Sequence, residues 1–397
     1  MTPLIKFTLS TIKMMKVHIQ SARRAFREIP QNQVATLAII ELAEDPIDAE
    51  NKKIPNVTVS NSNTEDTATS KEHEQSLKMT TINTINMQPQ DEKILARPIE
   101  HIVLAGPEDR NIFKQIIISF NTWVKCPPDA LKICVDVGNR IQDIFLVLDD
   151  IEDGTTLRRG FPAAHLVYGI PVTVHAAVYN TFRLMQKLFS YAENREDTVL
   201  DDFIMLGIRF FTGQGLEIRH RDIHQCPTFD DYAVLVRAKN TDAIIWGVRC
   251  LKLCAKNEEI EFGTDLYDKI GQFVQIYGDY INLHNPKYAA VRVFCDDLDE
   301  GKFSFPIIHA IQSYPNDHRL LDMLKKRPLD MESKKLFVDI MEGFGSFEYT
   351  RKVMEELKNG ILADVDKMNL RKNSCLERLL QDVFDNLETE IYYDGCD

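Results

Sequence analysis

The sequence predicts an all-α fold, in which one domain of long helices covers residues 91–397. Three observations support this prediction. After residue 91, apolar residues recur at the three- and four-residue spacing of one helix face. Glycine and proline divide these stretches into lengths that suit single helices. No segment alternates apolar and polar residues over the length of a strand, so the sequence offers no clear candidates for a sheet.

Helical spacing is clearest in two neighbouring stretches. The apolar residues with this spacing are Ile112, Ile116, Ile117, Phe120, Trp123 and Val124, and then Val135, Val137, Ile141, Ile144, Phe145 and Leu148. The residues expected to begin or end helices are Pro127, Pro128, Gly160, Pro162, Gly169, Pro171, Pro227 and Pro286. We therefore expect two consecutive helices that are separated at Pro127 and Pro128.

Two further segments precede the helical domain. Residues 1–28 hold six lysines and arginines, several serines and threonines, and no acidic residue before Glu28. This composition is typical of a mitochondrial transit peptide, and the alternative is a basic N-terminus without targeting meaning on a cytoplasmic protein. Residues 29–90 are rich in polar residues and offer too little apolar surface to offset the entropy of ordering, which predicts a disordered linker.

The composition limits the partners that we expect. A formal net charge of −13 argues against nucleic acid, because polyanions attract basic surfaces. No apolar run reaches the roughly 18 residues of a membrane span, so we expect no integral membrane association. The eight cysteines include no CxxC pair, which favours free thiols in a reducing compartment. Cys250 and Cys254 share a helix face by their spacing, and we expect them to pack in the core.

Four acidic residues follow directly after an apolar helical run, at Asp149, Asp150, Glu152 and Asp153. Asp149 and Asp153 lie one helical turn apart and face the same way. Like charges at this spacing repel, so we expect a cation between them, and their oxygens suit Mg²⁺ that also binds phosphate oxygens. The alternative is a solvated acidic helix end, which is disfavoured because the acids continue the apolar face.

Two arginines follow the acidic cluster, at Arg158 and Arg159. A guanidinium group carries forked N–H donors that match phosphate oxygens. Acids that bind a metal and arginines that bind phosphates together predict a diphosphate site, which neither group alone would indicate.

Four separated motifs are DDIED at 149–153, LRRG at 157–160, GQG at 213–215 and DDLDEGKFSFPIIHAI at 296–311. In this order they resemble the animal geranylgeranyl diphosphate synthases, which are trans-prenyltransferases. The resemblance runs from about Glu92 to beyond Arg327. It implies a bundle of long helices around a deep apolar cavity, a homodimer, and an allylic prenyl diphosphate as substrate.

The resemblance also implies roles for single residues. Asp149 and Asp153, with Asp150 beside them, would hold two magnesium ions, and Asp279 would belong to the site of a third. Basic and amide side chains would bind the diphosphates or line the reaction end: Arg158, Arg159, Lys239, Lys302, Gln214 and Gln275.

The sequence departs from the family where the second substrate, isopentenyl diphosphate, would bind. The family's Gly-Lys-Lys-x-Arg stretch corresponds to residues 109–113, where Arg110 is the only basic residue and Phe113 replaces the arginine. Gln142 stands where the family has a histidine, and Arg159 is the one clear remnant of this site. Charge-assisted hydrogen bonds contribute roughly 1.5–3 kcal/mol each. Loss of several basic groups therefore predicts that this site no longer binds isopentenyl diphosphate tightly.

The second acidic motif is also altered. Gly278 replaces its first aspartate, while Asp279 and Asn282 remain and could jointly hold the third ion in a shifted geometry. The family's Lys-Thr-Gly-Gly keeps only its lysine, as Lys239.

Aromatic residues are expected around the cavity. Phe145 lies one turn before Asp149, so its ring would form the floor of the channel and favour a short substrate. Phe211 stands where relatives often have a histidine. Other residues expected to face a carbocation are Phe210, Tyr277 and Tyr280, with Gln214 and Asn282 in the same cavity. The alternative for each aromatic residue is packing in the core.

Loss of the acceptor site with retention of the ionising site predicts a terpene synthase. We expect Mg²⁺-dependent conversion of geranyl diphosphate to an acyclic monoterpene of the ocimene, myrcene or linalool kind. The first alternative is a geranylgeranyl or shorter diphosphate synthase that condenses isopentenyl diphosphate with an allylic diphosphate. The second alternative is a degenerate subunit that regulates an active synthase.

Overall fold

The computed structural model describes residues 89–104, 112–192, 199–256, 259–284, 293–327, 329–368 and 372–388. The chain divides into two compact units, Met1–Ile82 and Asn83–Asp397, and all described residues belong to the second unit. The expected transit peptide lies outside the described residues, as does the linker except for its last two residues, which begin the first described helix. Mitochondrial import and the disorder of the linker therefore stay predictions.

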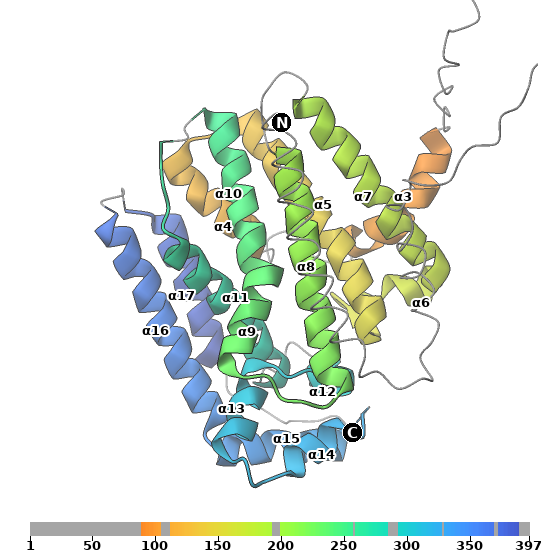
Figure 1. The fold of residues 1–397 in the computed structure, drawn as a ribbon, viewed down its shortest axis with the longest axis vertical. Coiled ribbons are helices and arrows are strands. Elements are labelled where there is room, and N and C mark those ends of the chain that lie inside the picture. The colour runs from red at the N-terminus through yellow and green to blue at the C-terminus, as the bar shows by residue number, and fades with distance from the viewer. Residues whose placement is uncertain are drawn as a thin grey trace, which may run out of the picture. The chain divides into compact units, whose positions relative to one another are not determined.

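The described part of the chain is almost entirely helical, which confirms the all-α prediction (Figure 1). Its longer helices are α3 (Pro89–Leu104), α4 (Ile112–Val124), α5 (Pro128–Asp153), α7 (Ile170–Ala192), α8 (Val199–Asp222), α10 (Asp242–Ala255), α11 (Thr264–His284), α15 (Met331–Gly343), α16 (Ser346–Lys367) and α17 (Ser374–Asp385). Its shorter elements are α6 (Ala164–Tyr168), α9 (Phe229–Val236), the π-helical turn η3 (Arg237–Thr241), α12 (Asp296–Glu300), α13 (Phe305–Ser313), α14 (Arg319–Leu324) and the 3₁₀ turn η5 (Asn386–Glu388).

Two clusters of buried apolar side chains hold these helices together. The larger cluster joins α4, α10, α11, α13, α16 and α17, and the smaller joins α3, α5, α7 and α8. In Figure 1, α16 and α17 lie on one side of this unit and α3 and α7 on the other. Full burial of one large apolar side chain contributes about 1.5–3 kcal/mol, so the packing of amphipathic faces, more than helix propensity, stabilises the fold.

One short hairpin was not expected from the sequence. The strands β1 (Leu157–Arg158) and β2 (Phe161–Pro162) pair antiparallel, with Arg158 opposite Phe161. The two residues between them, Arg159 and Gly160, have φ angles of 53° and 83°. Positive φ at both central residues is what a two-residue type I′ hairpin requires. Strands of two residues are too short to show alternation, which explains why the sequence pattern missed them.

None of the helices in the described ranges combines the length and the apolar character that crossing a bilayer demands.

The turn η3 packs closely against α11, and Gly271 makes that contact possible. A Cβ atom at Gly271 would overlap the hydroxyl and crowd the backbone of Thr241. Gly271→Ala is therefore expected to destabilise the protein by about 1–3 kcal/mol, because overpacking forces the backbone to shift. The measurement is the denaturant midpoint followed by circular dichroism.

Gly278→Ala is the matched control, since it lies on the same helix and its added Cβ would meet no atom within 4 Å. This variant is expected to keep or raise stability by up to about 1 kcal/mol, the usual helix preference of alanine over glycine. Equal losses of stability in both variants would contradict the close approach at Gly271.

Candidate active site

The acidic cluster lies at the C-terminal end of α5, where Gly154 ends the helix with a φ of 71°. Asp150 is 1% exposed and accepts a 2.8 Å hydrogen bond from Nε of Arg158. Nη2 of the same arginine lies 3.5 Å from Oδ2 of Asp149. The hairpin β1–β2 therefore turns Arg158 back onto the helix end, so the predicted acids and the first predicted arginine do come together.

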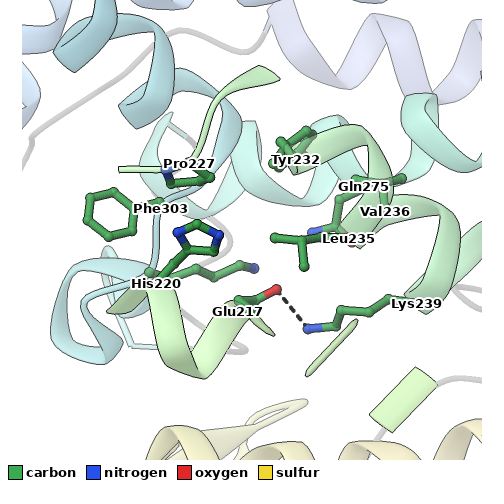
Figure 2. A pocket seen from close by; sticks show the side chains of 10 residues that line it. Glu217, His220, Pro227, Tyr232, Leu235, Val236, Lys239, Gln275 and Phe303 are labelled. Carbon is green, nitrogen blue, oxygen red and sulfur yellow. Dashed lines mark hydrogen bonds and ion pairs between the residues drawn. The ribbon is translucent and has the colours of Figure 1, made fainter. Parts of the chain in front are cut away.

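Lys239 reaches the acidic cluster from η3. Its Nζ donates hydrogen bonds of 2.6 Å to Oε1 of Gln214 and 3.0 Å to Oε2 of Glu217, and it lies 3.6 Å from Oδ1 of Asp149. Lys239 and Glu217 line a pocket together with Tyr232, Gln275 and Lys302. Figure 2 shows Lys239 and Glu217 pointing toward one another in this pocket. Burial acts to lower the pKa of Lys239, but the carboxylates of Glu217 and Asp149 outweigh it and raise the pKa, so this side chain is a fixed cation.

The position of Lys239 depends on a glycine of the predicted GQG motif. A Cβ atom at Gly213 would lie 2.8 Å from Cβ of Ala238 and 3.3 Å from Cγ of Lys239. Glycine thus allows α8 to approach η3 closely. A π-helical turn inside a run of α-helix often marks a functional site, and here it carries the lysine.

Asp279, which is 1% exposed, is contacted by three residues that line this pocket, namely Tyr232, Gln275 and Lys302. Its oxygens accept hydrogen bonds from the Tyr232 hydroxyl at 2.6 Å, from Nε2 of Gln275 at 2.8 Å and from the backbone N–H of Phe305 at 2.9 Å. Nζ of Lys302 lies 3.4 Å away. A metal ion at Asp279 would have to replace some of these donors, and its role as a metal ligand stays a prediction.

The other two residues of the altered motif have different surroundings. The side-chain oxygen of Asn282 accepts a 3.1 Å hydrogen bond from the backbone N–H of Asp297, so this amide holds the start of α12. An added Cβ at Gly278 would meet no atom of the described residues within 4 Å.

The donor set at the end of α5 fits a hard divalent cation. Burial raises the pKa of Asp153 to about 8, and the neighbouring carboxylates of Asp149, Glu300 and Glu217 act in the same direction. Arg221 supplies part of the compensating charge through a 2.7 Å hydrogen bond from Nη1 to Oδ1 of Asp153. Mg²⁺ prefers oxygen ligands, and a cation would offset the repulsion between these carboxylates. Asp149 and Asp153 are therefore the residues that would hold it.

The predicted aromatic residues divide into two groups. Phe145 stacks on Phe210 with ring centroids 3.9 Å apart, and the Phe211 ring meets it edge-on at 5.5 Å. Tyr280 packs in the core instead, where its hydroxyl accepts a 2.8 Å hydrogen bond from Arg351. Tyr277 is half-buried against the larger apolar cluster. The role of Phe145 as a channel floor stays a prediction.

The positions expected to bind the acceptor diphosphate are occupied differently. The Phe113 ring packs closely against Gly138 and Gly247. A Cβ atom added at Gly138 would lie 2.9 Å from the ring, and one added at Gly247 would lie 3.4 Å from it. Nη1 of Arg159 donates a 3.0 Å hydrogen bond to the carbonyl of Ile102. Gln142 is half-buried on α5, and Arg110 lies outside the described residues.

A buried carboxyl beside Arg159 is expected to make stability depend on pH. Burial raises the pKa of Asp143 from 3.8 to about 6, although Arg159, 3.9 Å away, acts in the opposite direction. Stability from the protonated form is complete below about pH 4 and is lost as the pH rises to about 6. Asp143→Asn should therefore be more stable than the parent at pH 7, by about 1–3 kcal/mol, and equal to it near pH 4.

The measurement is the melting temperature of both proteins between pH 4 and pH 8. Asp136→Asn is the control, because Asp136 is exposed on the same helix. A constant difference between Asp143→Asn and the parent across this range would show that Asp143 is ionised throughout.

Three residues of the site were missed from the sequence: Glu217, Arg221 and Tyr232. Glu217 and Arg221 follow Gln214 at spacings of three and seven, so all three share one face of α8. That spacing was a usable signal. The sequence pattern offers no signal for Tyr232, because its contact with Asp279 forms only when α9 packs against α11.

Comparisons with known proteins agree with this geometry. The model of the polyprenyl synthetase family matches residues 92–341, and the chain belongs to this family. A terpene synthase of Matsumurasca onukii is 35% identical over 293 residues, which covers 74% of this chain and 93% of that protein. A geranylgeranyl pyrophosphate synthase of Mucor circinelloides f. lusitanicus is 31% identical over 292 residues, with the same two coverages. One of Hypoxylon pulicicidum is 35% identical over 274 residues, or 68% of each chain.

The predicted resemblance to trans-isoprenyl diphosphate synthases is thus confirmed, and the chain is an enzyme of the prenyl synthase family. Most of these relatives carry the name of a geranylgeranyl pyrophosphate synthase and one carries that of a terpene synthase. By name, the relatives favour the prenyl-transfer alternative over the monoterpene synthase that we expected.

Proposed function

We propose that this enzyme ionises an allylic prenyl diphosphate with the help of Mg²⁺ and releases the resulting cation as a terpene. One observation carries the second half of the proposal: Phe113 of α4, at a position where the family binds the acceptor with arginine, packs against Gly138 of α5 and Gly247 of α10. An uncharged ring in that place cannot hold a diphosphate. The cation must then lose a proton, cyclise or capture water.

The residues around the pocket suit the ionisation step. Mg²⁺ would neutralise charge that develops on the diphosphate as the carbon–oxygen bond breaks. Lys239, Lys302 and Arg158 offer N–H donors to the same oxygens, and they are held in place by carboxylates before the substrate arrives. Donors that are fixed in this way need no reorganisation during the reaction.

Condensation with isopentenyl diphosphate is the second candidate function, and the names of most relatives favour it. It requires acceptor binding by Arg159 with Arg110 and other residues. A degenerate regulatory subunit is the third candidate. The grouping of Asp149, Asp153 and Lys239 at the end of α5 argues against it, because a scaffold needs no such arrangement.

One incubation series separates these candidates. The full chain is supplied with Mg²⁺ and geranyl, farnesyl or geranylgeranyl diphosphate, first alone and then with isopentenyl diphosphate, and volatile and diphosphate products are analysed separately. We expect a volatile ten-carbon product from geranyl diphosphate alone. A longer prenyl diphosphate formed only with both substrates would establish prenyl transfer, and no product under any condition would favour the regulatory subunit.

We also propose that the enzyme is a homodimer, and the support is an exposed apolar surface on α7 and α8. Ile204, Ile208 and Phe211 share one face of α8, and Val178 and Phe182 lie one turn apart on α7. The Phe182 side chain is 64% exposed. Soluble monomers rarely expose so many neighbouring apolar residues, and a twofold interface would bury them.

The double variant Val178→Glu/Phe182→Glu is expected to be monomeric by light scattering, because four buried carboxylates would face one another across the twofold axis. Val234→Glu is the control, since Val234 is 61% exposed on α9, which lies outside this surface. A double variant with the mass of the parent would contradict this interface.

A further inference from the structure

Three cysteines from separate segments meet at the opposite end of α5 from the acidic cluster. Cys126 lies in the loop between α4 and α5, Cys134 on α5 and Cys254 in the last turn of α10. Their Sγ atoms all lie within 4.8 Å of one another, and those of Cys134 and Cys254 are 3.8 Å apart. The described cysteines are free thiols, as the sequence predicted, but the meeting of these three was not expected from their spacing.

The loop that carries Cys126 is held firmly. The backbone N–H of Cys126 donates a 2.7 Å hydrogen bond to the side-chain oxygen of Asn121, and that of Lys125 donates a 2.9 Å hydrogen bond to the Asn121 carbonyl. Pro127 and Pro128 follow directly and fix the start of α5. Two of the three sulfur atoms therefore lie on helices, and the third lies on a loop with little freedom.

The geometry suits a metal ion that prefers thiolate ligands. A tetrahedral zinc site with bonds of about 2.3 Å separates its sulfur atoms by about 3.8 Å. The sulfur atoms of Cys134 and Cys254 already have this separation, and Sγ of Cys126 lies within 4.8 Å of both. Cys250, one turn before Cys254 on α10, or a water molecule would complete the four ligands.

The charge around the cluster also favours a cation. The C-terminal end of α10 carries partial negative charge, which disfavours a thiolate at Cys254 unless a cation is bound. A dication would supply that charge at the point where the three sulfur atoms meet.

We propose that Cys126, Cys134 and Cys254 form a structural zinc site that joins the α4–α5 loop to α10. Binding forms three zinc–sulfur bonds and breaks three S–H bonds, and the three protons pass to solvent. Cys134 lies about 22 Å along α5 from Asp149, so this site is separate from the carboxylates that suit Mg²⁺. Thiolates select zinc over magnesium, and carboxylates favour magnesium.

Zinc content tests this proposal. The full chain is produced with added Zn²⁺ and desalted, and metal is measured by mass spectrometry beside the single variants Cys134→Ser and Cys254→Ser. We expect about one zinc per chain in the parent, a loss of most of it in both variants, and no loss in Cys226→Ser, which removes a half-buried thiol elsewhere. Absence of zinc from the parent, or equal zinc in all variants, would overturn the proposal.

Four measurements on the unmodified chain test the proposal even where a variant fails to fold. Replacement of zinc by Co²⁺ should give an intense near-ultraviolet absorption from thiolate-to-metal charge transfer, and Zn²⁺ should protect three thiols from alkylation. A strong chelator should lower the melting temperature. A disulfide between Cys134 and Cys254, seen as the loss of two hydrogens in the intact mass, would also overturn the proposal.

Discussion

Asp149→Asn is expected to lower the turnover number by roughly a hundredfold to a thousandfold, the usual effect of removing one group that stabilises charge in a transition state. Asp149 lies 3.5 Å from Arg158 and 3.6 Å from Lys239, so its carboxylate faces the centre of the site. The variant loses a charged oxygen ligand for Mg²⁺ while its shape is unchanged. We also expect half-maximal activity to require a higher Mg²⁺ concentration.

The measurement is product formation from geranyl diphosphate at several Mg²⁺ concentrations, with circular dichroism to confirm that the helices remain. Asp136→Asn, an exposed change on the same helix, should keep the turnover number of the parent. If Asp149→Asn stayed within twofold of the parent, the carboxylates at the end of α5 would not be the metal ligands.

The helices could be read from the sequence because each has a local signal. Apolar residues from Ile112 to Val124 recur at helical spacing, and α4 has these bounds. Pro127 and Pro128 mark the break before α5, which begins at Pro128. The hairpin could not be read in this way. Gly160 suggests a turn, but the positive φ of Arg159 is imposed by pairing between β1 and β2, which is a tertiary effect.

The site was predictable where its residues are neighbours in the chain. The acids at 149–153 and the two arginines after them form one short stretch, and the structure brings Asp150 and Arg158 together. Contacts between different helices could not be predicted from the sequence pattern. Arg221 meets Asp153 across 68 positions of the chain, and the cysteines at 126, 134 and 254 meet across three segments.

Asp279 shows how a sequence motif and its surroundings can lead to different expectations. The motif suggests a metal ligand, whereas the structure surrounds its carboxylate with Tyr232, Gln275, Phe305 and Lys302. With Gly278 in place of the first aspartate, the carboxylate that remains is used to hold α9, α11 and α13 together. A third ion at Asp279 therefore stays a prediction.

Lys239→Met is expected to change two quantities in opposite directions. Loss of a charge-assisted hydrogen bond to the substrate costs about 1.5–3 kcal/mol, so kcat/KM for the allylic diphosphate should fall roughly tenfold to a hundredfold. Without substrate, however, the lysine ammonium lies 3.6 Å from Asp149 and 3.0 Å from Glu217, where it opposes a second cation. Removing it should tighten the binding of Mg²⁺ to the free enzyme.

Steady-state kinetics and titration of the substrate-free enzyme with Mn²⁺, followed by electron paramagnetic resonance, measure the two effects. Lys252→Met is the control, because Lys252 pairs with the exposed Glu261 and should change neither quantity. A misfolded variant would lose both turnover and metal binding, and a lysine that serves only packing would leave KM unchanged. A fall in kcat/KM together with tighter Mn²⁺ binding follows only if Lys239 faces both the substrate and the metal site, as its contacts with Asp149 and Glu217 require.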